Sequence, residues 1–156
     1  MNKLKNNKGI TMIALVVTII IMAILLTVVN YGSEKGLEMK ELNNMYADIL
    51  ILEEKISLYY LNKGELPLKD STKTINVNDT IKASNPNNNS EFYEIDISKL
   101  NNVSLNNMKD SRNSSDRYLI NKQSHTVYYQ KGVRLDGKVY YTIPEDYVEI
   151  DLSNYQ

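Results

Sequence analysis

A run of twenty consecutive uncharged residues near the start of the chain constrains its structure more than any other feature. Residues 10–29 contain thirteen Ile, Leu or Val, together with two Ala, two Met and three Thr. A helix of this length spans roughly 30 Å, which is the thickness of a bilayer's hydrocarbon core. The branched aliphatic side chains together contribute on the order of 4 to 8 kcal/mol towards insertion. The sequence therefore predicts a membrane-spanning helix over residues 10–29.

The charges on either side of this run predict its orientation. Lys3, Lys5 and Lys8 precede it, whereas Glu34 and Glu38 follow it. Positive residues beside a membrane helix tend to remain in the cytoplasm. We therefore expect a cytoplasmic N-terminus in a single-pass membrane protein, with the rest of the chain on the outer side of the cell membrane.

Two general interpretations of such a segment stand beside a more specific one. A cleaved secretory signal has an apolar region of about 7 to 15 residues, followed by small residues at the cleavage site. Here the run is longer, and Val28-Val29-Asn30-Tyr31-Gly32 offers no such site. An uncleaved single-pass anchor satisfies the same physical constraints and stays an alternative.

The specific interpretation rests on the junction between the basic leader and the apolar run. Lys8-Gly9 is followed directly by Ile10-Thr11-Met12-Ile13-Ala14-Leu15, without a spacer. This junction resembles the prepilin-type signal of type IV pilins and pseudopilins. The resemblance implies cleavage by a prepilin peptidase between Gly9 and Ile10, followed by N-methylation of Ile10. It also implies three kinds of partner besides the membrane, namely sister pilin subunits, the peptidase and an assembly platform.

One position departs from the family pattern. The family usually has glutamate at the fifth mature position, where it is thought to neutralise the N-terminal amine of a neighbouring subunit, but this chain has Ala14. A buried ammonium without a partner is expensive in free energy. The departure is compatible with a place at the tip of a fibre, because the first subunit has no predecessor whose amine it must neutralise.

Residues 30–63 predict an amphipathic helix that continues from the membrane segment. Its apolar residues recur at helical spacing and predict one buried face: Leu42, Met45, Tyr46, Ile49, Leu52, Ile56, Tyr59 and Tyr60. Its polar residues predict a solvated face: Lys40, Asn43, Asn44, Asp48, Glu54 and Lys55. Gly32 and Gly36 predict a bend or loosened turn, and Gly64 with Pro67 predicts the end of the helix.

Residues 64–116 form an Asn-rich region that predicts mostly loop. A short strand is expected at 74–77, and residues 92–100 are expected to form a strand or a short helix. The N-glycosylation tripeptides that start at Asn78, Asn88, Asn102 and Asn113 are attributed to chance in so Asn-rich a chain.

Residues 117–156 predict an antiparallel β-sheet. Five short β-favouring runs are expected as a four- or five-stranded meander: 117–121, 125–130, 133–135, 138–143 and 147–152. Asp136-Gly137 is a strong signal for a two-residue hairpin turn. The phrases Tyr118-Leu119-Ile120-Asn121 and Val127-Tyr128-Tyr129 look like the tails of pilin-like proteins from low-GC Gram-positive bacteria.

The composition offers few residues that could act in catalysis or bind a metal. The chain has no cysteine and one histidine, with 18 Lys+Arg against 19 Asp+Glu, so thiol chemistry is excluded and no basic field indicates nucleic acid. His125 is expected to be a surface or turn residue. Asp110, Asn113 and Asp116 lack the glycine and closing glutamate of a calcium loop. Neither a metal nor a cofactor is expected, and the protein is not expected to be an enzyme.

These observations together predict an α+β fold in which a long N-terminal helix packs on a small C-terminal antiparallel sheet. The expected organisation is a leader at 1–9, a membrane and assembly helix at 10–29, an amphipathic helix at 30–63, a loop region at 64–116 and a sheet at 117–156. The resemblance implies a structural subunit of a type IV pilus, or of a secretion or competence pseudopilus, that moves from the cell membrane to a surface fibre. The alternatives are a minor tip subunit that binds a surface, a substrate or DNA, and an unprocessed membrane-anchored surface protein.

Overall fold

The computed structural model describes residues 7–85, 91–110 and 112–144 of the 156-residue chain. Within the first helix, it describes the side chains of residues 14–26, 32 and 35–63. The strand expected at 147–152 lies outside the described residues. The chain forms two compact units, Met1–Met39 and Lys40–Gln156, and we call the second unit the head.

Helix α1 extends from Asn7 to Lys63, and its backbone is helical through both Gly32 and Gly36. The loosened turn expected at these glycines is therefore absent from the backbone, because the cost of about 1 kcal/mol per glycine is small beside the cooperative hydrogen bonding of a long helix. The predicted end is confirmed. Gly64 adopts a φ of 72°, and its N–H donates to the Tyr60 carbonyl at 2.8 Å, as in a helix that ends at a left-handed glycine.

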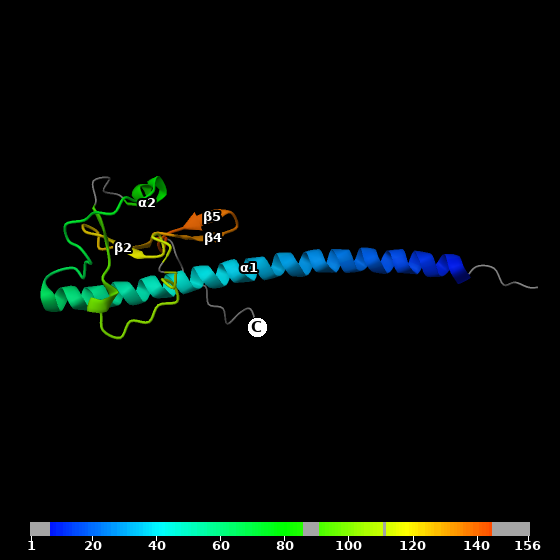
Figure 1. Ribbon diagram of the computed structural model, residues 1–156, viewed down its shortest axis with the longest axis horizontal. Coiled ribbons are helices and arrows are strands. Elements are labelled where there is room, and N and C mark those ends of the chain that lie inside the picture. Colours follow the sequence, from blue (N-terminus) through cyan, green and yellow to red (C-terminus); the bar gives the residue numbers. More distant parts are fainter. Residues whose placement is uncertain (1–6, 86–90, 111, 145–156) are drawn as a thin grey trace, which may run out of the picture. The chain divides into compact units, whose positions relative to one another are not determined.

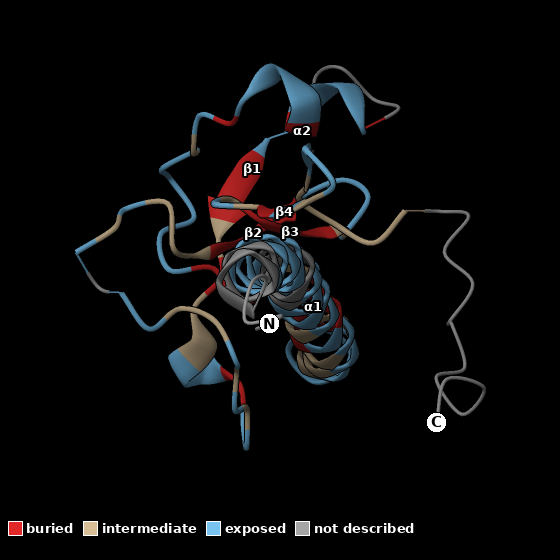
Figure 2. Cartoon of the chain, turned by 90° about the vertical axis from the view of Figure 1, so that its right-hand side faces the viewer, coloured by how far each residue is buried: buried red, intermediate tan, exposed pale blue. Residues whose placement is uncertain are grey.

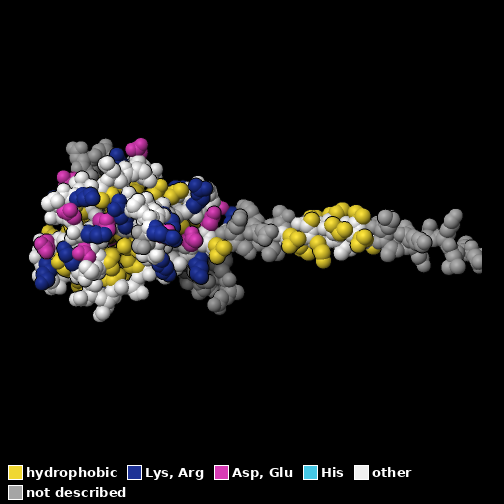
Figure 3. Space-filling model, in the orientation of Figure 1, with side chains coloured by type: hydrophobic (Ala, Val, Ile, Leu, Met, Phe, Trp, Pro, Cys, Tyr) yellow, Lys and Arg dark blue, Asp and Glu magenta, His cyan; other side chains and the backbone are white. Residues whose placement is uncertain are grey.

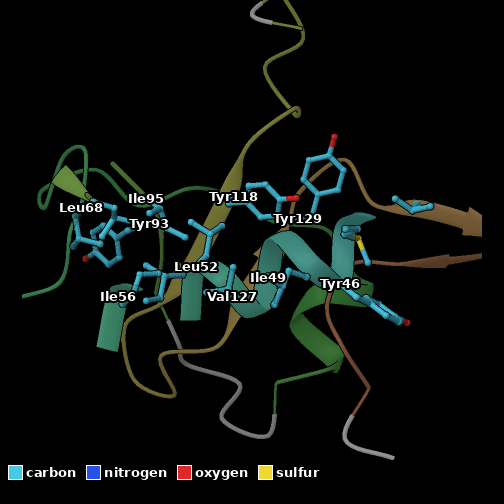
Figure 4. Close-up of a cluster of buried hydrophobic side chains, with 14 of the residues drawn as sticks. Tyr46, Ile49, Leu52, Ile56, Leu68, Tyr93, Ile95, Tyr118, Val127 and Tyr129 are labelled. Atoms are coloured by element: carbon cyan, nitrogen blue, oxygen red, sulfur yellow. The ribbon is translucent and has the colours of Figure 1, made fainter. Parts of the chain in front are cut away.

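The helical stripe predicted from the sequence forms one wall of the core of the head. Six of its members are at most 6% exposed: Leu42, Met45, Tyr46, Ile49, Leu52 and Ile56. Tyr59 is partly buried, whereas Tyr60 is 42% exposed at the end of the stripe. The solvated position predicted for Asp48 is wrong, since this residue is fully buried. Figure 4 shows the cluster.

The head contains two antiparallel sheets. Strands β1 (Phe92–Glu94), β2 (Tyr118–Asn121) and β3 (Val127–Tyr129) form one sheet in the order β1-β2-β3. Strands β4 (Val133–Leu135) and β5 (Lys138–Tyr140) form a separate hairpin. The single meander predicted from the sequence is therefore wrong. One neighbour of β2, strand β1, comes from the Asn-rich region, and β4 does not pair with β3.

The three-stranded sheet separates two apolar clusters. Tyr118 and Ile120 of β2 contribute to the cluster that contains the α1 stripe, whereas Leu119 contributes to a second cluster with Ile81 of helix α2 (Asp79–Ala83). Figure 2 shows α1 and α2 on opposite sides of the sheet. A short 3-10 helix, η1 (Ile97–Lys99), follows β1. The α+β fold is thus confirmed, with the part of α1 in the head packed against small antiparallel sheets (Figure 1).

Irregular segments of the head cover both edges of this sheet. Along β1, the N–H groups of Lys69 and Ile75 donate to the carbonyls of Glu94 and Phe92, at 3.0 and 2.8 Å. The strand expected at 74–77 is not regular, although Ile75 pairs in this way. Along β3, the Tyr129 N–H donates to the Tyr141 carbonyl at 2.7 Å, and the Thr142 hydroxyl donates to the Val127 carbonyl at 2.8 Å.

The hairpin turn predicted at Asp136-Gly137 is confirmed. Both residues have positive φ, 49° and 80°, between the paired ends Leu135 and Lys138, as a type I′ turn requires. Gly132 precedes β4 with a φ of 70°. It allows the chain to turn away from β3 and to pack under the side chains of β5 and the following residue.

Replacing Gly132 by alanine is expected to destabilise the head by about 2 to 4 kcal/mol. A Cβ at this position would lie 2.7 Å from side-chain atoms of both Val139 and Tyr141, in a backbone conformation that L-residues disfavour. Gly137→Ala is the matched control, because it has positive φ but no atom within 4 Å of the added carbon. Thermal unfolding of both variants measures the difference, and equal losses would contradict the role of the contact.

Candidate functional site

The predicted processing site, Gly9 and Ile10, lies at the start of α1. Lys3 and Lys5 lie outside the described residues, whereas the backbone of Lys8, Gly9 and Ile10 belongs to the first turn of α1. The first four N–H groups of a helix have no partner within it. Unwinding the first turn of α1 as far as Ile10 therefore breaks few hydrogen bonds. The backbone around the Gly9–Ile10 peptide bond can thus become extended at low cost in free energy.

Ala14 lies one turn after Ile10, in the part of the helix where the side chains are described. Its carbonyl accepts a hydrogen bond from the Thr18 hydroxyl at 2.7 Å. The hydroxyl is thereby satisfied within the helix, as polar side chains in an apolar surrounding require. Position 14 itself contributes neither a charge nor a polar side-chain atom.

The large apolar side chains between Leu15 and Leu26 are all exposed. Their exposed fractions range from 46% to 63%, and Figure 3 shows apolar side chains on the visible face of the described part of this unit. A helix that is apolar on all sides requires lipid or other protein around it. In the part of the chain where side chains are described, no helix has an apolar stretch long enough to cross a membrane. The predicted segment 10–29 includes side chains outside that part, at 10–13 and 27–29.

The head contains a buried carboxylate that sequence reasoning placed in solvent. Both oxygens of Asp48 accept hydrogen bonds from the loop after η1. The donors are the backbone and side-chain N–H groups of Asn106 and Asn107, at distances from 2.8 to 3.1 Å. The Tyr118 hydroxyl donates at 2.8 Å. Burial raises the pKa of Tyr118 above its ordinary value, so this hydroxyl keeps its proton.

A second carboxylate closes the next part of the same loop. Asp116 accepts the backbone N–H groups of Met108 and Asp110 at 3.0 and 2.8 Å, and the Tyr129 hydroxyl at 2.5 Å. Burial opposes ionisation of Asp116, but these hydrogen bonds outweigh it and lower its pKa. Asn113 accepts the Ser115 N–H at 3.0 Å. These oxygens therefore hold the loop itself, and among the described residues no group of acidic or histidine side chains could hold a metal ion.

Glu94 joins the loop before β1 to the sheet. Its carboxylate accepts Lys69 Nζ at 2.7 Å and Arg117 at 3.0 Å, and its side chain is 17% exposed. Burial alone would raise the pKa of Glu94, but the two cations outweigh burial and lower it below 4.5. The Arg117 guanidinium also donates to Gln130 at 2.6 Å. The arrangement is structural and contributes no reactive group.

Acid is expected to destabilise the head through Glu94. Because its pKa is lower in the folded state, its contribution is fully present above the unfolded value of about 4.5, and it is lost as pH falls through the folded value. Glu94→Gln is therefore expected to cost roughly 1 to 2 kcal/mol at pH 7 and less at pH 3. Glu54→Gln, which changes an exposed carboxylate beside Lys55, is the control. Urea unfolding at the two pH values measures the loss, and a loss independent of pH would contradict this assignment.

His125 lies in the turn between β2 and β3, exposed and with a φ of 59°. The expectation of a turn histidine is confirmed. Its ring contacts Tyr60 edge-on, with the ring centroids 5.1 Å apart. The neighbouring tyrosines of β3 pack in different clusters: Tyr129 joins Tyr118 in the cluster with the α1 stripe, whereas Tyr128 packs in the second cluster.

Comparisons with known proteins add no assignment to this geometry. No family model matches the chain, and no match is found among curated proteins or among solved structures.

Proposed function

We propose that this protein is a structural subunit of a type IV pilus or pseudopilus, processed after Gly9 and polymerised through its N-terminal helix. The observation that carries the proposal is the direct junction of a basic leader, Gly9 and a charge-free run of twenty residues. A helix that extends from Asn7 to Lys63 supports it, because one element carries both the exposed apolar surface and the stripe that builds the head.

The exposed apolar side chains explain how such a subunit moves from membrane to fibre. Before assembly, lipid surrounds the side chains from Leu15 to Leu26. In the fibre, equally apolar helices of sister subunits replace the lipid, so that transfer carries no large hydrophobic penalty. The proposed partners are therefore the membrane, sister subunits, a prepilin peptidase and an assembly platform. The proposed location is the cell membrane first and a surface fibre later.

Ala14 favours a minor tip subunit as the second candidate function. A subunit without a carboxylate at this position does not neutralise the amine of a preceding subunit, and a tip subunit has no predecessor. This candidate predicts normal fibre mass with few copies of this chain in each fibre. Counting copies by quantitative mass spectrometry of sheared fibres distinguishes the two candidates.

The intact mass of the protein tests the proposal. Chain extracted from cells with an active prepilin peptidase is expected to lack Met1–Gly9 and to carry one additional methyl group on Ile10. The same mass is expected for chain in sheared surface fibres. A full-length chain that remains in the membrane beside an active peptidase would contradict processing and would support the unprocessed anchor.

A further inference from the structure

A groove in the head contains a carboxylate that forms no ion pair with another described residue. The groove has a volume of about 430 Å³ and lies between the last turns of α1 and the β2–β3 turn; Glu53, Ile56, Tyr60, Leu61, His125 and Thr126 line it. Glu53 accepts one long hydrogen bond, from the Val127 N–H at 3.4 Å. Among the described residues, none forms an ion pair with it.

The surroundings of Glu53 suit a long cationic side chain. Leu61 and Tyr60 line the same groove and remain 80% and 42% exposed. Lys and Arg place their methylene stems on apolar surface while their charged ends bind a carboxylate. Burial raises the pKa of Glu53, an effect that the Val127 hydrogen bond only partly offsets. Ionised Glu53 therefore costs stability in a single chain at neutral pH, so its charge does not serve the fold of that chain.

An exposed cation that forms no ion pair among the described residues lies at the other end of the head. Arg134 of β4 is exposed, and no ion pair joins its guanidinium to another described residue. The β4–β5 hairpin lies towards the Tyr46 end of the core, whereas Ile56 lies at the opposite end (Figure 4). Glu53 lies seven residues after Tyr46, which is about 10 Å along the helix towards Ile56. Among the described residues, no ion pair joins Arg134 to Glu53 within one chain.

We propose that the groove binds Arg134 from the β4–β5 hairpin of a second copy, so that heads join end to end. The contact uses two different surfaces, and repeated contacts of this kind extend into an open chain instead of closing a dimer. This proposal rests on the proposed function, because it assigns the head its own contact within the fibre. The guanidinium pairs with the carboxylate, and the arginine stem packs on Leu61 and Tyr60.

Disulfide cross-linking tests the contact against a clean background, since the chain has no cysteine. The full-length double variant Glu53→Cys/Arg134→Cys is expected to give a ladder of cross-linked species on mild oxidation, both in fibres and in the detergent-extracted membrane fraction. Each single variant is expected to stay monomeric, because the two surfaces differ. The matched control Glu54→Cys/Arg134→Cys is expected to give at least tenfold less ladder, because residue 54 points about 100° away around the helix.

Exchanging the two charges provides a second test of the proposed contact. Glu53→Arg and Arg134→Glu are each expected to reduce fibre yield several-fold, and the double exchange is expected to restore it. Glu53→Gln keeps the fold, with an unchanged or higher melting temperature, which separates loss of contact from loss of folding. Processed chains in fibres without a 53–134 ladder, or single variants that dimerise equally well, would overturn this contact while leaving the proposed function intact. Retention of the leader, with no fibres from the unaltered chain, would instead overturn the proposed function.

Discussion

A chain in which Gly9 is replaced by phenylalanine is expected to retain its leader and to be missing from surface fibres. A peptidase must hold the scissile bond extended, and the first turn of α1, from Asn7 to Ile10, opens at the cost of few hydrogen bonds. A bulky side chain at the bond restricts both the backbone and its approach to the enzyme. We expect processing to fall at least a hundredfold, as measured by the intact mass of membrane-extracted chain.

Two variants make this result specific to position 9. Gly9→Ala adds only a methyl group and is expected to be processed more slowly, though not to be blocked. Asn6→Phe introduces the same bulk three residues earlier and is expected to leave cleavage intact. If Gly9→Phe matures and enters fibres like the unaltered chain, the proposed processing site is wrong.

Replacing Asp48 by alanine is expected to destabilise the head by about 3 to 5 kcal/mol. The change leaves the backbone N–H groups of Asn106 and Asn107 and the Tyr118 hydroxyl without their acceptor in a buried place. Unpaired buried donors cost more than their hydrogen bonds contribute when made. Since a domain of this size has a total stability of about 5 to 15 kcal/mol, this loss is a large fraction of the whole. Urea unfolding of the processed chain in detergent measures it.

Two control variants separate the stability lost with the Asp48 carboxylate from any stability change caused by helix propensity. Glu54→Ala, on the exposed face of the same helix, is expected to change stability by less than about 0.5 kcal/mol. Tyr118→Phe removes one donor and retains the other four, and it is expected to cost about 1 kcal/mol. A loss for Asp48→Ala no larger than that for Glu54→Ala would show that the carboxylate does not hold the loop.

The parts of the fold that local pattern determines could be predicted. The spacing of Leu42, Met45, Ile49, Leu52 and Ile56 predicted the buried face of α1, because packing against a sheet requires one apolar side. Gly64 predicted the helix end, and Asp136-Gly137 predicted the β4–β5 turn, since both positions require positive φ. These features depend on residues that are close together in the sequence.

The buried position of Asp48 could not be predicted, because its partners are distant in the sequence. Asn106 and Asn107 lie nearly sixty residues later, in a region where asparagines are so frequent that none stands out. The helical wheel nevertheless carried a signal. Asp48 lies between Met45 and Ile49, next to the buried stripe, where a carboxylate requires donors if it is covered.

The pairing of the sheets was missed for a related reason. β1 comes from the Asn-rich region and pairs with β2, so the third strand is supplied by a segment with only three regular residues. Tyr141 occupies the edge of β3 where β4 was expected, after Gly132 has turned the chain away. Side-chain alternation identifies strands but does not rank their possible neighbours.

The covered edges of the three-stranded sheet have a consequence for crowding. Heads brought close together at high concentration would aggregate if their strands offered open backbone groups to one another. In the described part of the head, the segments around Lys69 and Ile75 occupy one edge, and Tyr141 with Thr142 occupies the other. If the protein is the proposed pilin subunit, its heads can therefore be concentrated without sheet-to-sheet fusion, and ordered growth is left to surfaces that strand pairing does not use.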